Sequence, residues 1–242
     1  MDDVVVVIPA RFGSSRFPGK VLYPILGRPM VWWVWEASRR AGFARDQVII
    51  ATDSDEVRDT AQSFGAKVVM TSPDCASGSD RCAEAVQDLD CRWIINLQAD
   101  EPAVKPELIS NFAEFLKNSC VSMASIYTDL RGRSDDPNVV KVILDKEGFA
   151  IYFSRSPIPY PRYPDRVRYY QHIGIYGYAR DFLLEFVSWP KGYLESVEGL
   201  EQLRAVERGV KIKMFYSDCE MHGVDVLEDV KVVESLMGGG DA

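Results

Sequence analysis

Residues 4–20 read VVVVIPARFGSSRFPGK, a run of five β-branched residues followed by a loop rich in Gly, Ser and Pro. An uninterrupted apolar run of this length is typical of a strand buried on both faces, as in a parallel sheet. The loop carries three cations, Arg11, Arg16 and Lys20, among residues that let the backbone approach a ligand closely. The stretch therefore predicts a buried first strand that ends in a loop suited to bind an anion.

The order of short strand, polar loop and helix repeats along the first half. Further strands are expected at 48–51, 68–70 and 93–97, and helices at 29–41, at 55–64 and within 77–89. This repetition predicts an α/β fold with a doubly wound, mainly parallel, Rossmann-like sheet. Ligands bind such sheets outside the carboxyl ends of the strands, which is where the polar loops lie.

The second half follows a different pattern. It has less helix between its expected strands, which suggests a smaller subdomain with a mixed sheet. The chain is therefore expected to form one domain in three parts, at about 1–118, about 119–190 and 191–237, the last returning to the core. The expected strands are 121–127, 139–144, 149–153 and 173–178, and the expected helices are 195–207 and 228–236.

Composition limits the partners of the chain. Its 242 residues carry a net charge of -8, which argues against broad binding to nucleic acid or to an anionic membrane. No apolar run reaches the roughly 18 residues that span a bilayer. The five cysteines include no CxxC pair and no signal peptide precedes them, so a cytoplasmic protein with reduced thiols is expected.

The first loop is suited to phosphate chemistry. Backbone N–H groups and the three cations would screen a triphosphate before an oxygen nucleophile approaches. The loop is neither a Walker A loop nor the GxGxxG loop of dinucleotide-binding proteins. A solvated loop with a chance basic cluster is the alternative interpretation.

Two carboxylates from distant parts of the sequence suit a divalent cation. Asp100 follows the expected strand at 93–97, and Asp225 lies in a late turn after Gly223 and Val224. Mg²⁺ prefers one or two carboxylates together with substrate phosphates and water. Taken singly, either residue could instead be a helix cap or part of a solvated turn.

Seven motifs in a fixed order resemble those of the 3-deoxy-manno-octulosonate cytidylyltransferases, and they cover the chain from about residue 4 to 236. They are IPARFGSSRFPGK at 8–20, ATD at 51–53, QADEP at 98–102, YFSR at 152–155, HIGIYGY at 172–178, LEQLR at 200–204 and GVD at 223–225. One such motif would be weak evidence, whereas seven in order are specific.

The resemblance implies a nucleotide-diphospho-sugar transferase-like fold and a known reaction. The anomeric hydroxyl of an acidic eight-carbon sugar would attack the α-phosphorus of CTP and release pyrophosphate, for lipopolysaccharide synthesis. Mg²⁺ on Asp100 and Asp225 would lower the pKa of the hydroxyl, and Arg11 and Lys20 would stabilise charge on the phosphates. The resemblance also implies a homodimer, with 119–190 as the sugar-binding and dimerisation part.

The resemblance assigns further residues to each substrate. The predicted nucleotide-binding residues are Pro9, Ala10, Arg11, Ser14, Arg16, Lys20, Thr52, Asp53, Ser77, Arg81 and Ala99. The predicted sugar-binding residues are Gln98, Arg155, His172, Tyr178, Glu201 and Gln202, with Arg155 facing the sugar carboxylate. Taken alone, His172 could be a structural histidine, and one of Tyr176 and Tyr178 is expected to be a core residue.

Some positions depart from the usual family pattern. Ala99 stands where Gly is usual, Cys75 where His is frequent, and Val226-Leu227 where Thr-Pro is usual. The stretch TSPDCASGSDR at 71–81 is similar to that of relatives that use the 8-amino-3,8-dideoxy sugar. The substrate is therefore expected to be 3-deoxy-manno-octulosonate or its 8-amino analogue.

Three alternatives remain open at this point. A cytidylyltransferase for sialic-acid-like sugars would share the early motifs. A nucleotide-sugar glycosyltransferase would need a DxD-like metal motif, which Asp53-Ser54-Asp55 matches formally, although helix capping also explains it. A non-catalytic nucleotide-binding protein would bind CTP without turnover.

Overall fold

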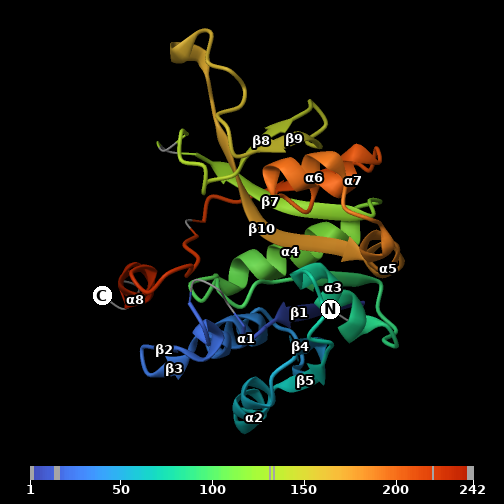
Figure 1. The fold of residues 1–242 in the computed structure, drawn as a ribbon, viewed down its shortest axis with the longest axis vertical. Coiled ribbons are helices and arrows are strands. Elements are labelled where there is room, and N and C mark those ends of the chain that lie inside the picture. The colour runs from blue at the N-terminus through green and yellow to red at the C-terminus, as the bar shows by residue number, and fades with distance from the viewer. Residues whose placement is uncertain (1–2, 14–16, 131, 133, 220, 239–242) are drawn as a thin grey trace. The chain divides into compact units, whose positions relative to one another are not determined.

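The computed structural model describes residues 3–13, 17–130, 132, 134–219 and 221–238 (Figure 1). The chain forms two compact units, Met1–Glu114 with Glu220–Ala242, and Phe115–Cys219. The first boundary lies close to the predicted one near 118. The return to the first unit comes at residue 220 rather than at 191, because the helices and the strand between these positions belong to the second unit.

A parallel sheet forms the centre of the first unit, with strands in the order β6-β1-β4-β5. Residues 4–8 are buried, as expected of a strand covered on both faces. The predicted α/β class with a mainly parallel sheet is confirmed. The four strands are β1 Val4–Pro9, β4 Val48–Thr52, β5 Lys67–Met70 and β6 Trp93–Asn96.

Helices and short elements connect these strands. Ser54 caps α2, since its Oγ accepts the N–H of Val57 at 3.4 Å. The helices are α1 Met30–Arg40, α2 Asp55–Ser63, α3 Gly78–Val86, α4 Pro106–Asn118 and α8 Asp229–Gly238. The short elements are η1 Lys20–Leu22, β2 Pro24–Ile25, β3 Arg28–Pro29 and η2 Arg45–Gln47.

The second unit contains the expected mixed sheet. β7 pairs in parallel with β11 and antiparallel with β10, and β8 pairs antiparallel with both β10 and β9. The segment between β9 and β10, drawn in gold, extends away from this sheet and holds η3 Pro164–Arg166 (Figure 1). The strands are β7 Met123–Asp129, β8 Lys141–Leu144, β9 Ala150–Ser154, β10 Tyr170–Ala179 and β11 Ile212–Tyr216, and α5 is Arg180–Ser188.

The single helix predicted at 195–207 is wrong. The chain forms two short helices, α6 Tyr193–Glu198 and α7 Leu203–Glu207, because Gly199 adopts a left-handed φ of 63° and ends the first. A buried ion pair then links them: Arg204 Nε and Nη2 donate to the Glu195 carboxylate, each at 2.7 Å.

Candidate functional site

A cavity of about 270 Å³ lies in the first unit, lined by residues that follow β1 and β6 and by the start of α3. This is the edge of a parallel sheet at which ligands are expected. Nine of the predicted site residues line the cavity: Pro9, Arg11, Lys20, Ser77, Arg81, Gln98, Ala99, Asp100 and Asp225.

Backbone hydrogen bonds define the start and the end of the loop after β1. The N–H of Ala10 donates to Ala51 O at 2.8 Å, so the buried Ala10 extends the strand pairing and does not line the cavity. Gly19 closes the loop by donating to Phe12 O at 3.1 Å with a left-handed φ of 69°, a conformation that favours glycine. Two predicted nucleotide-binding residues, Ser14 and Arg16, lie outside the described residues.

Lys20 joins the two predicted metal ligands. Its Nζ lies 2.6 Å from Asp100 Oδ2 and 3.8 Å from Asp225 Oδ1, and it donates to Val224 O at 3.0 Å. Two carboxylates from distant sequence thus face one cation, whose side chain is 13% exposed. The ammonium group marks a point at which a cation is stabilised by both carboxylates.

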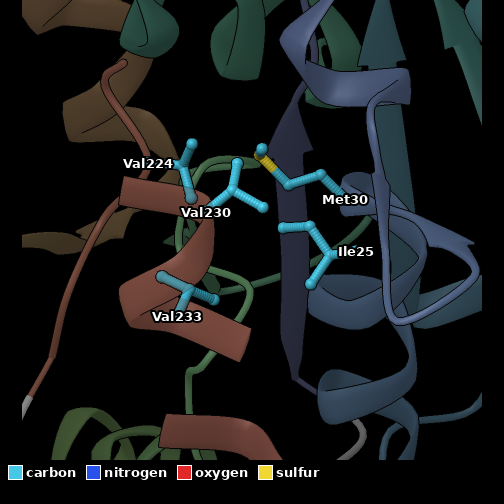
Figure 2. Close-up of a cluster of buried hydrophobic side chains, with 5 residues drawn as sticks. All are labelled: Ile25, Met30, Val224, Val230 and Val233. Carbon is cyan, nitrogen blue, oxygen red and sulfur yellow. The ribbon is translucent and has the colours of Figure 1, made fainter. Parts of the chain in front are cut away.

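An apolar cluster brings Asp225 to this point. Val224, Val230 and Val233 lie against Ile25 and Met30, all of them buried (Figure 2). Within the turn, the N–H of Val224 donates to Asp100 O at 2.8 Å, and the N–H of Asp225 to Asp229 Oδ2 at 2.8 Å. The position of Asp225 therefore depends on the docking of α8.

We expect Val233→Ala to lower the free energy of unfolding by about 2 kcal/mol, because it leaves a cavity in this cluster. Val232→Ala is the matched control, since Val232 is on the same helix but 45% exposed, and should have almost no effect. Urea unfolding of both variants measures the difference. Equal effects would show that α8 is not anchored through Val233.

Glu101 is a group next to this site to which the sequence interpretation assigned no role. Burial raises the pKa of its carboxyl to about 8, helped by the charges of Asp100 and Asp225 and opposed by Lys20. Gly223 leaves room for this carboxyl group, because a Cβ on residue 223 would stand 3.0 Å from Glu101 Oε1. The signal in the sequence was its place beside Asp100 in the QADEP motif.

Arg81 is held in a fixed position at the start of α3. Its Nη2 donates to Asp53 Oδ2 at 3.0 Å and its Nη1 to Thr71 Oγ1. Ser77 caps the helix, because its Oγ accepts the N–H of Asp80 at 3.2 Å. Asp53 and the buried Thr52, both predicted to bind nucleotide, do not line the cavity, and Asp53 instead orients Arg81.

The formal DxD motif is explained by local structure. Asp53 pairs with Arg81, Ser54 caps α2, and Asp55 pairs with Arg58 on the helix surface. None of these three residues lines the cavity. The capping interpretation of this motif is therefore confirmed.

Gln98, Ala99 and Cys75 also line the cavity. Gln98 Nε2 donates to Asn96 Oδ1 at 2.9 Å, which orients the amide. Ala99 is not among the described residues with positive φ, so its backbone does not require glycine. Cys75 Sγ donates to Glu84 Oε2 at 3.2 Å, and burial together with this partner raises the pKa of the thiol to about 11. The thiol is therefore protonated at neutral pH and is no nucleophile.

Arg155 lies in the second unit among backbone carbonyls. Its Nε donates to Glu198 O at 2.9 Å and its Nη1 to Pro137 O at 2.9 Å, and its Nη2 lies 3.5 Å from Gly199 O. A guanidinium has five N–H donors, so these three contacts leave it further capacity for an anion.

His172 and Gln202 belong to one buried hydrogen-bond chain. Tyr176 OH donates to Gln202 Oε1 at 3.0 Å, and Gln202 Nε2 lies 3.5 Å from His172 Nδ1. His172 Nε2 lies 2.8 Å from Ser125 Oγ, which donates to Ile175 O at 2.8 Å. Burial lowers the pKa of His172 to about 3, so the ring is neutral. The structure thus brings together two of the predicted sugar-binding residues.

The remaining two predicted sugar-binding residues differ in exposure. Tyr178 is 1% exposed and stacks with Tyr176, Phe182 and Phe186, which is the packing role expected of one of the two tyrosines. Glu201 is half-buried, and its carboxylate contributes to raising the pKa of the Tyr176 hydroxyl, a shift caused mainly by burial.

Some chemical features can be stated for the described part of the chain. It contains no group of three or more His, Cys, Asp or Glu side chains able to hold a metal ion, so the candidate metal site rests on two carboxylates. All five cysteines are described, and none of them forms a disulfide. Among the described residues, no helix combines the length and apolar character needed to cross a membrane.

The sequence of the chain is similar to that of known cytidylyltransferases. Residues 5–212 match the cytidylyltransferase family model. The chain is 41% identical to 3-deoxy-manno-octulosonate cytidylyltransferase of Thermodesulfovibrio yellowstonii, over 96% of this chain and 97% of that protein. It is 43% identical to 8-amino-3,8-dideoxy-manno-octulosonate cytidylyltransferase of Shewanella sediminis, over 97% and 98%.

The fold of the chain is also similar to that of a solved structure. CMP:2-keto-3-deoxy-manno-octonic acid synthetase in complex with CTP matches with a TM-score of 0.92 and 38% identity, over 98% of both chains. Full-length similarity at this identity, together with the seven motifs and the fold, establishes the relationship. The chain belongs to the 3-deoxy-manno-octulosonate cytidylyltransferase family of nucleotidyltransferases.

Proposed function

We propose that this chain transfers CMP from CTP to 3-deoxy-manno-octulosonate or its 8-amino analogue and releases pyrophosphate. The observation that carries the proposal is the convergence of Asp100 and Asp225 on Lys20, in a cavity that Arg11 also lines. This combination of cations and carboxylates suits a nucleoside triphosphate, and its residues come from the family's own motifs.

The reaction needs no covalent intermediate with the protein. The anomeric oxygen of the sugar forms a bond to the α-phosphorus as the bond to pyrophosphate breaks, and the hydroxyl proton passes to solvent. Arg11 and Lys20 stabilise the negative charge on the phosphate oxygens, and Arg81 orients the base and ribose side of CTP. Arg155 binds the sugar carboxylate through its remaining N–H groups.

Asp100 and Asp225 are proposed as the ligands of Mg²⁺. The fit rests on the chemistry of the donors: two carboxylates already stabilise one cation, the Lys20 ammonium, at the edge of the cavity. When bound, Mg²⁺ would supply a Lewis acid for the phosphate oxygens and the sugar hydroxyl. The residues themselves provide the negative charge and the position.

Three further features belong to the proposal. The product would serve lipopolysaccharide synthesis, and the enzyme would act in the cytoplasm as a homodimer. Support for the dimer comes from the segment between β9 and β10, where Tyr160 is 82% exposed and Tyr163 is 65% exposed. Large exposed aromatic side chains of this kind are enriched at protein interfaces.

Parallel assays with the two sugars test the substrate. The purified chain with CTP and Mg²⁺ should release pyrophosphate with at least one of 3-deoxy-manno-octulosonate and its 8-amino analogue. Release with the amino sugar alone would tie the unusual stretch at 71–81 to a changed substrate. Release of a nucleoside diphosphate would indicate a glycosyltransferase, and no release with either sugar would overturn the assignment of the acceptor.

A further inference from the structure

Lys141 is a buried cation to which the proposed mechanism gives no role. It stands at the first position of β8 with none of its surface exposed. Its Nζ donates to three backbone carbonyls: Asp136 O at 3.0 Å, Val139 O at 2.7 Å, and Arg155 O. Burying an ammonium group is costly, and accordingly burial lowers the pKa of Lys141.

The contacts of Lys141 surround Arg155. Lys141 holds the main chain of Arg155 and both ends of the loop 136–139, and Pro137 O in that loop accepts from Arg155 Nη1. On the other side, Glu198 accepts the N–H of Arg155 at 3.0 Å and the Ser154 hydroxyl at 2.6 Å. Two other chain segments, 136–139 and 198–199, therefore meet at the guanidinium, and Lys141 links the first of them to the main chain of Arg155.

We propose that Lys141 is a positioning residue that holds Arg155 ready for the carboxylate of the sugar acid. The inference rests on the proposed function, in which Arg155 is the carboxylate partner. Three donors of the ammonium match three carbonyl acceptors, so the loop has one defined position relative to Arg155. A guanidinium held in advance binds a carboxylate without a further cost of ordering.

Replacement by an apolar side chain of similar length separates this role from packing. Lys141→Met fills the same space but removes the ammonium donor from three carbonyls, of which Asp136 O alone is also bonded by the N–H of Val139. The loop 136–139 is therefore expected to shift. A displacement of about 1 Å at a positioning group can cost about 10²-fold. The loss should fall on the sugar acid, because the proposed CTP site is the cavity of the first unit, which Lys141 does not line.

Steady-state kinetics of Lys141→Met test the proposal. We expect the KM for the sugar acid to rise by about tenfold or more, with the KM for CTP within about twofold of the wild type. Lys213→Met is the matched control, since Lys213 Nζ also donates to a backbone carbonyl of this unit, Glu147 O, away from Arg155. It should leave both KM values unchanged.

A double-variant cycle tests whether Lys141 acts through Arg155. In an Arg155→Met background, Lys141→Met should raise the KM for the sugar acid no further, because the positioned group is already absent. Additive effects, or an equal rise in both KM values, would overturn the proposal. So would an unchanged KM for the sugar acid in Arg155→Met alone.

Two controls keep the test decisive. If Lys141→Met does not fold, Lys141→Gln retains donors for part of the carbonyl set and should give a smaller rise in the same KM. The wild type is assayed first, because a lack of turnover with both sugars would contradict the proposed function itself. If the wild type turns over and Lys141→Met raises the KM values for the sugar acid and for CTP equally, only the positioning role is contradicted.

Discussion

Asp100→Asn and Asp225→Asn should each lower the rate of CMP transfer by about 10³-fold or more while the protein remains folded. Asn keeps the size of the side chain but removes one of the two negative charges that face Lys20. The two charges come from distant parts of the sequence, so either loss leaves a site with one carboxylate. With one negative charge fewer, such a site attracts Mg²⁺ less strongly and holds it in a less defined position.

Pyrophosphate release measures this loss, and thermal unfolding followed by circular dichroism checks the fold. Asp59→Asn is the matched control: Asp59 lies on α2, has an exposed side chain that pairs with Arg58, and does not line the cavity. It should have the rate of the wild type. Near-normal rates in either Asp100→Asn or Asp225→Asn would refute the metal assignment.

Lys20→Met should have two effects of opposite sign. The kcat/KM for CTP should fall by about 10²-fold, because a cation that stabilises the phosphates is lost. In the absence of nucleotide, the affinity for Mn²⁺ should rise by about tenfold, because the ammonium no longer repels a second cation from the carboxylates. A residue with a purely structural role would not improve metal binding.

Titration with Mn²⁺, followed by electron paramagnetic resonance, measures the second effect without turnover. Adding CTP should tighten Mn²⁺ binding more in the wild type than in Lys20→Met, because the triphosphate draws Lys20 away from Asp100 and Asp225. Lys67→Met is the control, since Lys67 lies on β5 with its Nζ 3.5 Å from Asp46 O. Unchanged Mn²⁺ affinity in Lys20→Met would contradict the idea that Lys20 and the metal compete.

Local sequence determined the four parallel strands of the first unit and the helices α1, α2 and α3, but not α4 or the pair of β2 and β3. The β-branched run at 4–8 predicts a buried strand since each of its side chains must leave water, whichever face it points to. Ser54 and Ser77 specify helix starts through their own hydroxyl groups, which act within three residues of the chain. The family motifs identified further residues that line the cavity, because the order of these motifs can be recognised in the sequence alone.

Longer-range features were not accessible in this way. The sequence pattern suggested one helix at 195–207, but Gly199 takes a left-handed conformation that divides it, and the Glu195–Arg204 pair joins the parts. β11 was not predicted from its own residues, and its strand structure depends on pairing with β7, more than 80 residues earlier. The division of this helix and the formation of β11 depend on contacts with distant residues, which a local sequence pattern does not contain.

In the candidate site too, the sequence and the tertiary structure determine different things. The sequence by itself identified the residues that are proposed to act: the cations of the first loop, Asp100, Asp225 and Arg155. Only the tertiary structure decided which of them meet. Asp225 reaches Lys20 because apolar burial docks α8 against Ile25 and Met30. Arg155 is oriented by three backbone carbonyls, those of Pro137, Glu198 and Gly199. Burial and distant hydrogen bonds set these positions, because both depend on parts of the chain that are neighbours only after folding.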